Sequence, residues 1–426
     1  MAKKGIREYD AKRLINKALP GYSNDRFHTD GRLVLVTPET DLDGLAQDNP
    51  WLNDTKLVVK PDQLFGKRGK NNLLLVNATF PKVRSWIEER MNEEVTIVQT
   101  TGETMGILTH FLIEPFVPHE EEYYLAFTSR ADADIIHFSL HGGVDIEEVW
   151  DSVVTIEVPI LTDPATVDVL SQLPEMKEKE MVAAFIKALY QVYCDYYFAY
   201  LEFNPIAFHE GTLVPLDTVA KLDDTAAFQC ADKWGKIEFP KAFGSVSTPE
   251  EAHIAALDEK TGASLKLTLL NPEGRVWNLV AGGGASVIYA DTVVDLGYGK
   301  ELANYGEYSG NPTTEQTYEY TKTILDLMTR RPDPQGRPKF LLIGGGIANF
   351  TDVAKTFTGI IKALEDYKDK LRENNVRIFV RRGGPNYKEG LENMRRLGER
   401  IGIPLQVFGP ETHMTRIVSL ALEEEK

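Results

Sequence analysis

Short apolar runs alternate with longer polar and amphipathic stretches along the whole chain. In the first half the runs are brief and follow one another closely, with one longer helical pattern near 180–198. Strand-like segments occur at 33–36, 57–59, 73–76, 111–129, 152–161, 199–203 and 212–216. This mixture predicts an α+β region with an antiparallel component.

The second half has a different and more regular spacing. Apolar runs at 276–281, 339–343, 376–380 and 404–408 alternate with helical patterns near 285–296, 314–330, 352–371 and 387–400. Strands separated by single helices are typical of βαβ units, so we expect a flavodoxin-like, doubly wound parallel α/β domain. Such a domain binds ligands at the carboxyl ends of its strands.

A chain of 426 residues is too long for one ordinary core, so more than one domain is expected. Residues 236–249 contain proline and serine but no core periodicity, which predicts a linker. We therefore expect domains at 1–242 and 243–426.

Charge and cysteine content narrow the function classes. The net charge of −17 argues against nucleic acid or an anionic membrane as a partner, and means that local positive charge must attract an anionic substrate. Cys194 and Cys230 lack metal-ligand spacing and are expected to be reduced thiols. We find no secretory signal and no apolar run near the ~20 residues of a membrane helix, so a soluble cytoplasmic protein is expected.

The candidate anion site lies in the second half, where two apolar runs break into glycines. Residues 342–351 (LIGGGIANFT) lead into a helical pattern with Asn349 and Thr351 at its start, and 378–386 (IFVRRGGPN) contains Arg381 and Arg382. A strand, a glycine turn and a helix N-terminus present backbone N–H groups to an anion. The pattern predicts a site for a small, multiply charged acid or a phosphoryl group.

The first half contains two segments suited to a nucleotide. Lys60 ends an apolar strand close to the basic loop 67–70, an arrangement suited to nucleotide phosphates, although the spacing alone favours a solvated basic turn. The two prolines of 113–118 would leave the Val117 N–H free to contact an adenine edge, with Glu122 placed for ribose. An edge strand followed by an acidic turn is the alternative.

A possible metal site is formed by Asn204 and Asp217. They lie on strand-like segments joined by the turn Glu210-Gly211, and a hairpin would bring the two side chains together as oxygen ligands for Mg²⁺. Without further context, two ordinary polar residues of a hairpin are the favoured interpretation. The glycine turns at 282–286 and 344–349 do not complete G-x-G-x-x-G, and no histidine spacing suggests zinc. Residues 141–143 (HGG) are expected to form a turn.

The order of these segments resembles the β subunit of succinyl-CoA synthetase, an ATP-grasp enzyme, and more closely the ATP-citrate lyase family. The similarity covers nearly the whole chain. Its most specific runs are 58–64, 111–119, 262–272, 301–310, 347–351 and 379–386. The resemblance implies an N-terminal ATP-grasp domain followed by a citrate-binding domain.

The resemblance also implies site residues by position. Those matching the ATP site are Lys60, Arg68, Gly69, Pro115, Val117 and Glu122. Those matching metal positions are Asn204, Asp217, Asp258, Thr261 and Ala263. Those matching citrate-binding positions are Gly310, Asn349, Thr351, Tyr367 and Arg382.

One feature of the family is absent from this sequence. The family carries its phosphoryl group on a histidine in a Gly-His-Ala-Gly-Ala loop, and the 426 residues contain no such loop. The resemblance therefore implies no catalytic residue on this chain and a larger partner subunit with the phosphohistidine, the CoA-binding and the citrate-synthase-like modules. ATP, Mg²⁺ and citrate would bind here, and CoA mainly on the partner. Rival interpretations are the small subunit of a citryl-CoA synthetase, succinyl-CoA synthetase β, and a non-catalytic citrate sensor.

Overall fold

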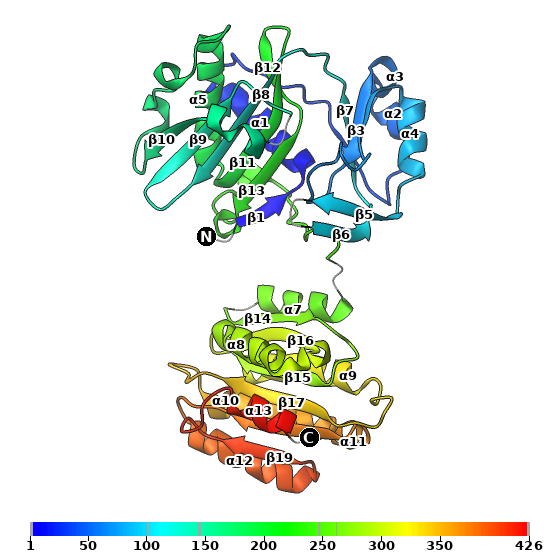
Figure 1. Ribbon diagram of the computed structural model, residues 1–426, viewed down its shortest axis with the longest axis vertical. Coiled ribbons are helices and arrows are strands. Elements are labelled where there is room, and N and C mark those ends of the chain that lie inside the picture. The colour runs from blue at the N-terminus through cyan, green and yellow to red at the C-terminus, as the bar shows by residue number, and fades with distance from the viewer. Residues whose placement is uncertain (1–2, 100–101, 144–145, 246–247, 261, 424–426) are drawn as a thin grey trace. The chain divides into compact units, whose positions relative to one another are not determined.

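The computed structural model describes residues 3–99, 102–143, 146–245, 248–260 and 262–423. The chain divides into two compact units, 1–245 and 246–426 (Figure 1). No helix in the described ranges is long and apolar enough to cross a membrane. Cys194 and Cys230 are both free thiols.

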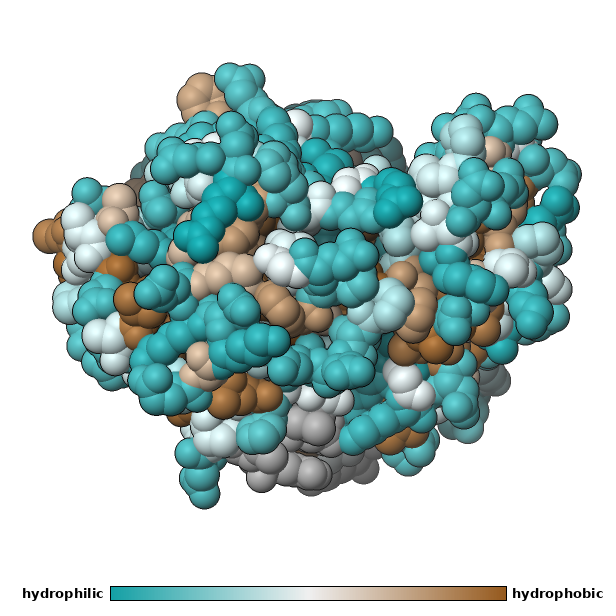
Figure 2. Space-filling model, turned by 90° about the horizontal axis from the view of Figure 1, so that it is seen from above, coloured by the Kyte–Doolittle hydropathy of each residue, from teal (hydrophilic) through white to brown (hydrophobic). Residues whose placement is uncertain are grey.

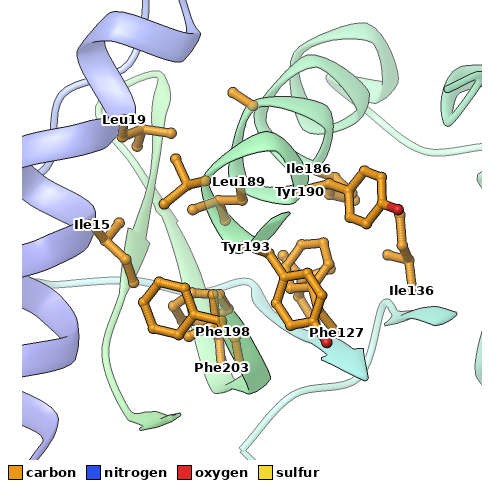
Figure 3. Close-up of a cluster of buried hydrophobic side chains, with 14 of the residues drawn as sticks. Ile15, Leu19, Phe127, Ile136, Ile186, Leu189, Tyr190, Tyr193, Phe198 and Phe203 are labelled. Atoms are coloured by element: carbon orange, nitrogen blue, oxygen red, sulfur yellow. The ribbon is translucent and has the colours of Figure 1, made fainter. Parts of the chain in front are cut away.

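The larger sheet of unit 1 is antiparallel, with strand order β1-β13-β11-β8-β9-β10 and with β12 paired to β11. Its strands are β1 (Lys3–Ile6), β8 (Glu122–Ser129), β9 (Ala133–Ser139), β10 (Val154–Pro159), β11 (Phe198–His209), β12 (Thr212–Pro215) and β13 (Thr218–Asp223). Helices α1 (Glu8–Tyr22) and α5 (Lys179–Asp195) pack on it through apolar residues that recur every three to four positions. Figure 3 shows this core, in which Phe127 and Tyr193 stack at 5.6 Å between ring centroids.

A smaller sheet completes unit 1, in the order β2-β7-β3-β4. Its strands are β2 (Val34–Val36), β3 (Leu57–Pro61), β4 (Leu75–Ala78) and β7 (Phe111–Pro115). Helices α2 (Leu45–Asp48), α3 (Trp51–Asp54) and α4 (Phe80–Glu88) and the hairpin of β5 (Glu94–Gln99) and β6 (Gly102–Ile107) accompany it. This sheet has its own hydrophobic core, separate from that of the larger sheet, so unit 1 contains two cores.

The segment predicted as a linker is largely packed against unit 1. Phe243 is 7% exposed in the core of the smaller sheet, and Ala242 forms a β-bridge with Leu64. Ile237 and Phe239 pack on the core of the larger sheet. Most of the linker predicted at 236–249 is therefore part of unit 1, because single apolar residues without periodicity still anchor the segment.

Unit 2 is built on a six-stranded sheet in the order β14-β16-β15-β17-β18-β19. Its strands are β14 (Ser264–Leu269), β15 (Val276–Ala281), β16 (Asn304–Ser309), β17 (Lys339–Gly345), β18 (Val376–Arg381) and β19 (Leu405–Phe408). Only β14 is antiparallel to its neighbour. Counting the five parallel strands along the chain gives the order 2-1-3-4-5, which is the flavodoxin-like arrangement.

Helices cover both faces of this sheet, as the βαβ pattern predicts. One face packs against α7 (Pro249–Glu259), α9 (Thr314–Thr329), α10 (Val353–Asp366), α11 (Lys368–Glu373) and α12 (Tyr387–Ile401). The other face packs against α8 (Gly283–Val293) and α13 (Arg416–Glu423). The order of strands reverses between β15 and β17, so a crevice is expected at their carboxyl ends.

Candidate functional site

A cavity of about 380 Å³ lies in unit 1 between the smaller sheet and the segment that joins β12 to β13. Figure 2 views this unit from above and shows its surface hollowed between a larger and a smaller mass. All six residues assigned to the nucleotide line the cavity, together with Asp217. These residues are Lys60, Arg68, Gly69, Pro115, Val117 and Glu122. The structure therefore brings together segments separated by up to 157 residues of chain (60 to 217).

One end of the cavity is strongly charged. Lys60 lies two residues after Val58 on β3, so both side chains point to the cavity face, opposite Glu114 of β7. The Lys60 ammonium lies 3.1 Å from Glu114 and donates to the Leu216 carbonyl at 2.6 Å. Arg68 donates to Asp217 at 2.7 Å. Burial lowers the pKa of Lys60, but the neighbouring carboxylates outweigh it and raise the pKa above its usual value, so Lys60 stays charged.

Glu8 on α1 holds these cations together, and the sequence analysis missed it. Its carboxylate accepts from Lys60 at 2.8 Å, from Arg68 at 3.1 Å and from the Thr218 N–H at 3.2 Å, and Lys12 lies 2.9 Å away. Burial raises the pKa of Glu8, but the three cations outweigh it and hold the pKa far below its usual range. Glu8 thus links strands of both sheets across the cleft.

A sequence signal for Glu8 and Lys12 did exist. Both lie at helical spacing with Ala11 and Ile15, on the buried stripe of α1. Charged residues in the apolar stripe of a helix are rarely buried unless they are paired, so their position indicates a polar partner inside the fold.

The other end of the cavity is suited to a flat aromatic ring. Phe116 donates its N–H to the Lys56 carbonyl at 2.7 Å, whereas the Val117 N–H finds no acceptor among the described residues. His119 contacts both the Val117 carbonyl at 2.7 Å and the Glu122 carboxylate at 2.8 Å. The free N–H next to an oriented carboxylate matches the arrangement predicted for an adenine edge and a ribose.

The turn at 141–143 supports this end of the site. The Gly142 N–H donates to the Glu122 carbonyl at 2.9 Å, and a Cβ at Gly143 would overlap the Glu122 carboxylate. Gly143 has φ +71° and donates its N–H to Asn204 Oδ1 at 2.8 Å. The two glycines therefore allow one loop to approach both Glu122 and Asn204.

Asn204 and Asp217 are adjacent, as the hairpin predicted. The Asn204 N–H donates to the Asp217 carbonyl at 3.1 Å, and the turn at 210–211 has the positive φ of a tight hairpin. No three His, Cys, Asp or Glu side chains converge on a metal site in the described part of the chain. One amide and one carboxylate, the latter lining the cavity, fit Mg²⁺, which takes few protein ligands.

The remaining predicted metal residues belong to unit 2. Asp258 accepts a hydrogen bond from the Leu265 N–H at 2.7 Å and pairs with Lys266. Ala263 directly precedes β14. Thr261 lies outside the described residues. Asp258 thus already has two partners, one of them a lysine.

A second pocket, of about 310 Å³, lies in unit 2 at the carboxyl ends of β15 and β17. This is the position where the strand order reverses. Gly310, Thr351 and Arg382 line the pocket, and Asn349 lies in the same turn, between the lining residues Ala348 and Phe350. The structure therefore brings four of the five predicted acid-binding residues to one crevice.

Tyr367 is the exception, because it follows the last residue of α10. A helix rises about 1.5 Å per residue, so the 14 residues of α10 separate Tyr367 from the turn at 349–351 by about 20 Å. Its ring instead lies 5.0 Å from the Lys370 ammonium. The geometry of unit 2 gives Tyr367 no place in the pocket.

Arg382 is the positive charge of this pocket. Its side chain is 2% exposed and donates to the Gly346 carbonyl at 3.0 Å, while its Nε has no partner and no carboxylate forms an ion pair with it among the described residues. A Cβ at position 345 would overlap this guanidinium, which explains why this position is occupied by glycine. The neighbouring Arg381 donates only to the carbonyls of Gly345, Pro410 and Thr412, so its role is structural.

The helix N-terminus that faces the pocket differs from the predicted one. α10 begins at Val353, after Asn349 and Thr351, and Asp352 caps it by accepting from the Lys355 N–H at 3.0 Å. α8 has no side-chain cap, and Gly282 and Gly284 at its start line the pocket. Asn349 and Thr351 lie in a loop, and the Asp352 side chain already accepts from an N–H group at the start of α10. The helix N-terminus available to an anion is therefore that of α8.

Two family descriptions cover this chain. Residues 2–234 match the ATP-citrate synthase ATP-grasp domain, and residues 245–424 match the ATP citrate lyase citrate-binding domain. The fold class inferred from the sequence, an ATP-grasp domain followed by a doubly wound α/β domain, is thereby confirmed.

Curated relatives extend over the whole chain. The chain is 50% identical to the ATP-citrate synthase of Bos taurus over 430 residues, covering 99% of this chain but 38% of that protein. It is 49% identical to ATP-citrate synthase alpha chain protein 1 of Arabidopsis thaliana, covering 99% of each chain. The chain thus spans less than half the length of the animal relatives and nearly all of the plant alpha chain.

A solved structure supports the same relationship. The ATP citrate lyase from Methanothrix soehngenii, in complex with citrate and coenzyme A, superposes with a TM-score of 0.90 at 55% identity, covering 99% of this chain and 100% of that chain. With two family matches and relatives of this similarity over its whole length, the chain belongs to the ATP-citrate lyase family.

Proposed function

We propose that this chain is the ATP- and citrate-binding subunit of a two-subunit ATP-citrate lyase. One observation carries the proposal: the same chain has a cleft with three buried cations at one end and, on a separate sheet, a pocket with a buried arginine that lacks a carboxylate partner. A nucleotide needs the first arrangement, and a polycarboxylic acid needs the second.

In the cleft, each residue has a distinct role toward ATP. The Val117 N–H donates to the adenine edge, and the Glu122 carboxylate accepts from the ribose hydroxyls. Lys60 and Arg68 pair with the phosphates, and the Gly69 backbone allows these to approach closely. Because Arg68 is now paired with Asp217 at 2.7 Å, bound phosphate competes with that ion pair and leaves the carboxylate available.

Asn204 and Asp217 are the residues that would hold Mg²⁺. Their oxygens suit a hard cation, and the ion would supply charge neutralisation for the phosphoryl group in transfer. Asp217 contacts Arg68 and Lys60 through Oδ1, so its second carboxylate oxygen, Oδ2, suits this role.

In unit 2, the acid lies between the α8 N-terminus and Arg382. The guanidinium pairs with one carboxylate of citrate, and Thr351 and Asn349 supply polar groups for the hydroxyl and a further carboxylate. Gly310 has a φ of +72°, and a Cβ at this position would approach the Ala263 Cα to 3.1 Å. The lack of a side chain therefore allows the two backbone segments to lie close together.

The phosphoryl group reaches citrate through a histidine of the partner subunit, giving citryl phosphate, and CoA bound mainly by the partner then gives citryl-CoA. The absence of the histidine loop from the 426 residues supports this division. The animal relatives, of which this chain spans 38%, contain further modules in the same polypeptide.

Reconstitution tests the proposal. The full chain is co-expressed with a chain that matches the remainder of the animal relatives, and acetyl-CoA and oxaloacetate are measured with ATP, Mg²⁺, citrate and CoA. Formation of both products that requires all four components supports the lyase. Accumulation of citryl-CoA without cleavage would assign a citryl-CoA synthetase instead, and turnover with succinate in place of citrate would overturn the substrate assignment.

A further inference from the structure

Two buried polar atoms without partners lie at the pocket of unit 2. Tyr308 on β16 is 1% exposed and lines the pocket, and its hydroxyl makes no hydrogen bond to any described residue. The same holds for Nε of Arg382. An unsatisfied buried polar atom costs on the order of 1–3 kcal/mol, so native proteins retain few of them without a reason.

The backbone of Tyr308 is held firmly beside the glycine turn of α8. Tyr308 pairs with Ala281 of β15, and its carbonyl accepts from the Gly282 N–H at 3.2 Å. Burial raises the pKa of the phenol, against the opposing charge of Arg382, so Tyr308 remains a neutral donor at neutral pH. A phenol and a guanidinium offer two kinds of donor, and neither the Tyr308 hydroxyl nor Nε of Arg382 has an acceptor among the described residues.

A second tyrosine of the same core behaves differently. Tyr320 on α9 lies 6.1 Å from Tyr308 between ring centroids, and its hydroxyl donates to the Lys266 carbonyl at 2.7 Å. Tyr320 is also fully buried. The two buried tyrosines therefore differ in their hydroxyls: that of Tyr320 is hydrogen-bonded within the protein, and that of Tyr308 is bonded to no described residue.

We propose that Tyr308 is a further binding residue of the acid pocket, and that its hydroxyl donates to an oxygen of the same citrate molecule that Arg382 holds. The inference rests on the proposed function, since it requires the acid to occupy this pocket. It also makes Tyr308 a specificity residue, because an acid without an oxygen at that position leaves the hydroxyl unpaired, and sites built on hydrogen bonds reject such analogues strongly.

The test is a pair of matched variants of the full chain, Tyr308→Phe and Tyr320→Phe. Citrate affinity is measured by calorimetry and stability by thermal unfolding without ligand. Tyr308→Phe is expected to weaken citrate binding about tenfold or more while leaving the unfolding temperature unchanged or higher, because it removes an unsatisfied hydroxyl. Tyr320→Phe is expected to lower the unfolding temperature and to leave citrate affinity within about twofold.

The outcomes separate this inference from the proposed function. If the wild-type chain binds citrate and Tyr308→Phe binds it equally well, the inference on Tyr308 is overturned and the citrate site stands. If Tyr308→Phe loses both stability and affinity, the hydroxyl is structural and the inference is likewise overturned. If the wild-type chain binds no citrate, the proposed function itself fails, and this inference with it.

Discussion

Replacing Arg382 with methionine isolates the charge of the acid pocket. Methionine keeps much of the aliphatic stem of the arginine and removes the guanidinium, which is the part that lies against Gly345. A hydrogen bond to a charged group contributes about 1.5–3 kcal/mol, and about 1.4 kcal/mol corresponds to a factor of ten in affinity. Because no carboxylate of the described residues competes for Arg382, this contribution goes to the ligand, and citrate affinity is expected to fall about tenfold to a hundredfold.

Calorimetric titrations of citrate and of ATP on the same preparation check this prediction. ATP affinity should change by less than about threefold, since the nucleotide residues belong to a separately folded unit. Arg395→Met is the matched control: it removes the same charge from an exposed position on α12 and should alter neither affinity. Unchanged citrate binding in Arg382→Met, or equal losses of citrate and ATP binding, would refute the reasoning and make Arg382 structural.

Further predictions concern the nucleotide site, the phosphoryl acceptor and the buried Asp62. Lys60→Met is expected to weaken ATP binding about tenfold to a hundredfold, and Asp217→Asn to raise the Mg²⁺ concentration needed for ATP binding; calorimetry that finds neither effect excludes this cleft as the ATP site. The chain incubated alone with labelled ATP should form no acid-labile, base-stable phosphohistidine, and stoichiometric labelling of its own histidines would contradict the two-subunit account. Burial raises the pKa of the Asp62 carboxyl to about 6, whereas an unfolded aspartate has a pKa of about 4. The stability that comes from this shift is therefore fully present below about pH 4 and is lost as the pH rises through about 6. The free energy of unfolding of Asp62→Asn should therefore increase relative to that of the wild type between pH 4 and 7, and a pH-independent difference in denaturant titrations would contradict the assigned cause.

The parallel strands of unit 2 could be predicted closely from the sequence. The run at 276–281 coincides with β15, and the other runs begin or end within a few residues of β17, β18 and β19. Strands buried on both faces must be continuously apolar, so they stand out from their surroundings. β16 was missed for the opposite reason, since Asn304–Ser309 is polar and its buried positions include Asn304 and Tyr308.

The site could be predicted only in part, because resemblance assigns residues by position and not by contact. Lys60, Arg68 and Asp217 were found in this way, whereas Glu8, which holds two of them, was not. Its role depends on α1 packing across the cleft, which no local pattern specifies. The helix predicted to begin near 352 does begin there, at Val353, but Asn349 and Thr351 were wrongly placed at its start, because Asp352 is the capping residue.

We propose that this chain binds citrate itself, at a site separate from that of the nucleotide. The most direct test is a calorimetric titration of the full chain with citrate and then, in a separate experiment, with succinate, which lacks one carboxylate and the hydroxyl. The account predicts one citrate per chain and succinate binding weaker by about a hundredfold or more, because the pocket then leaves buried polar groups unpaired. Equal binding of the two acids, or no binding of citrate, would contradict it.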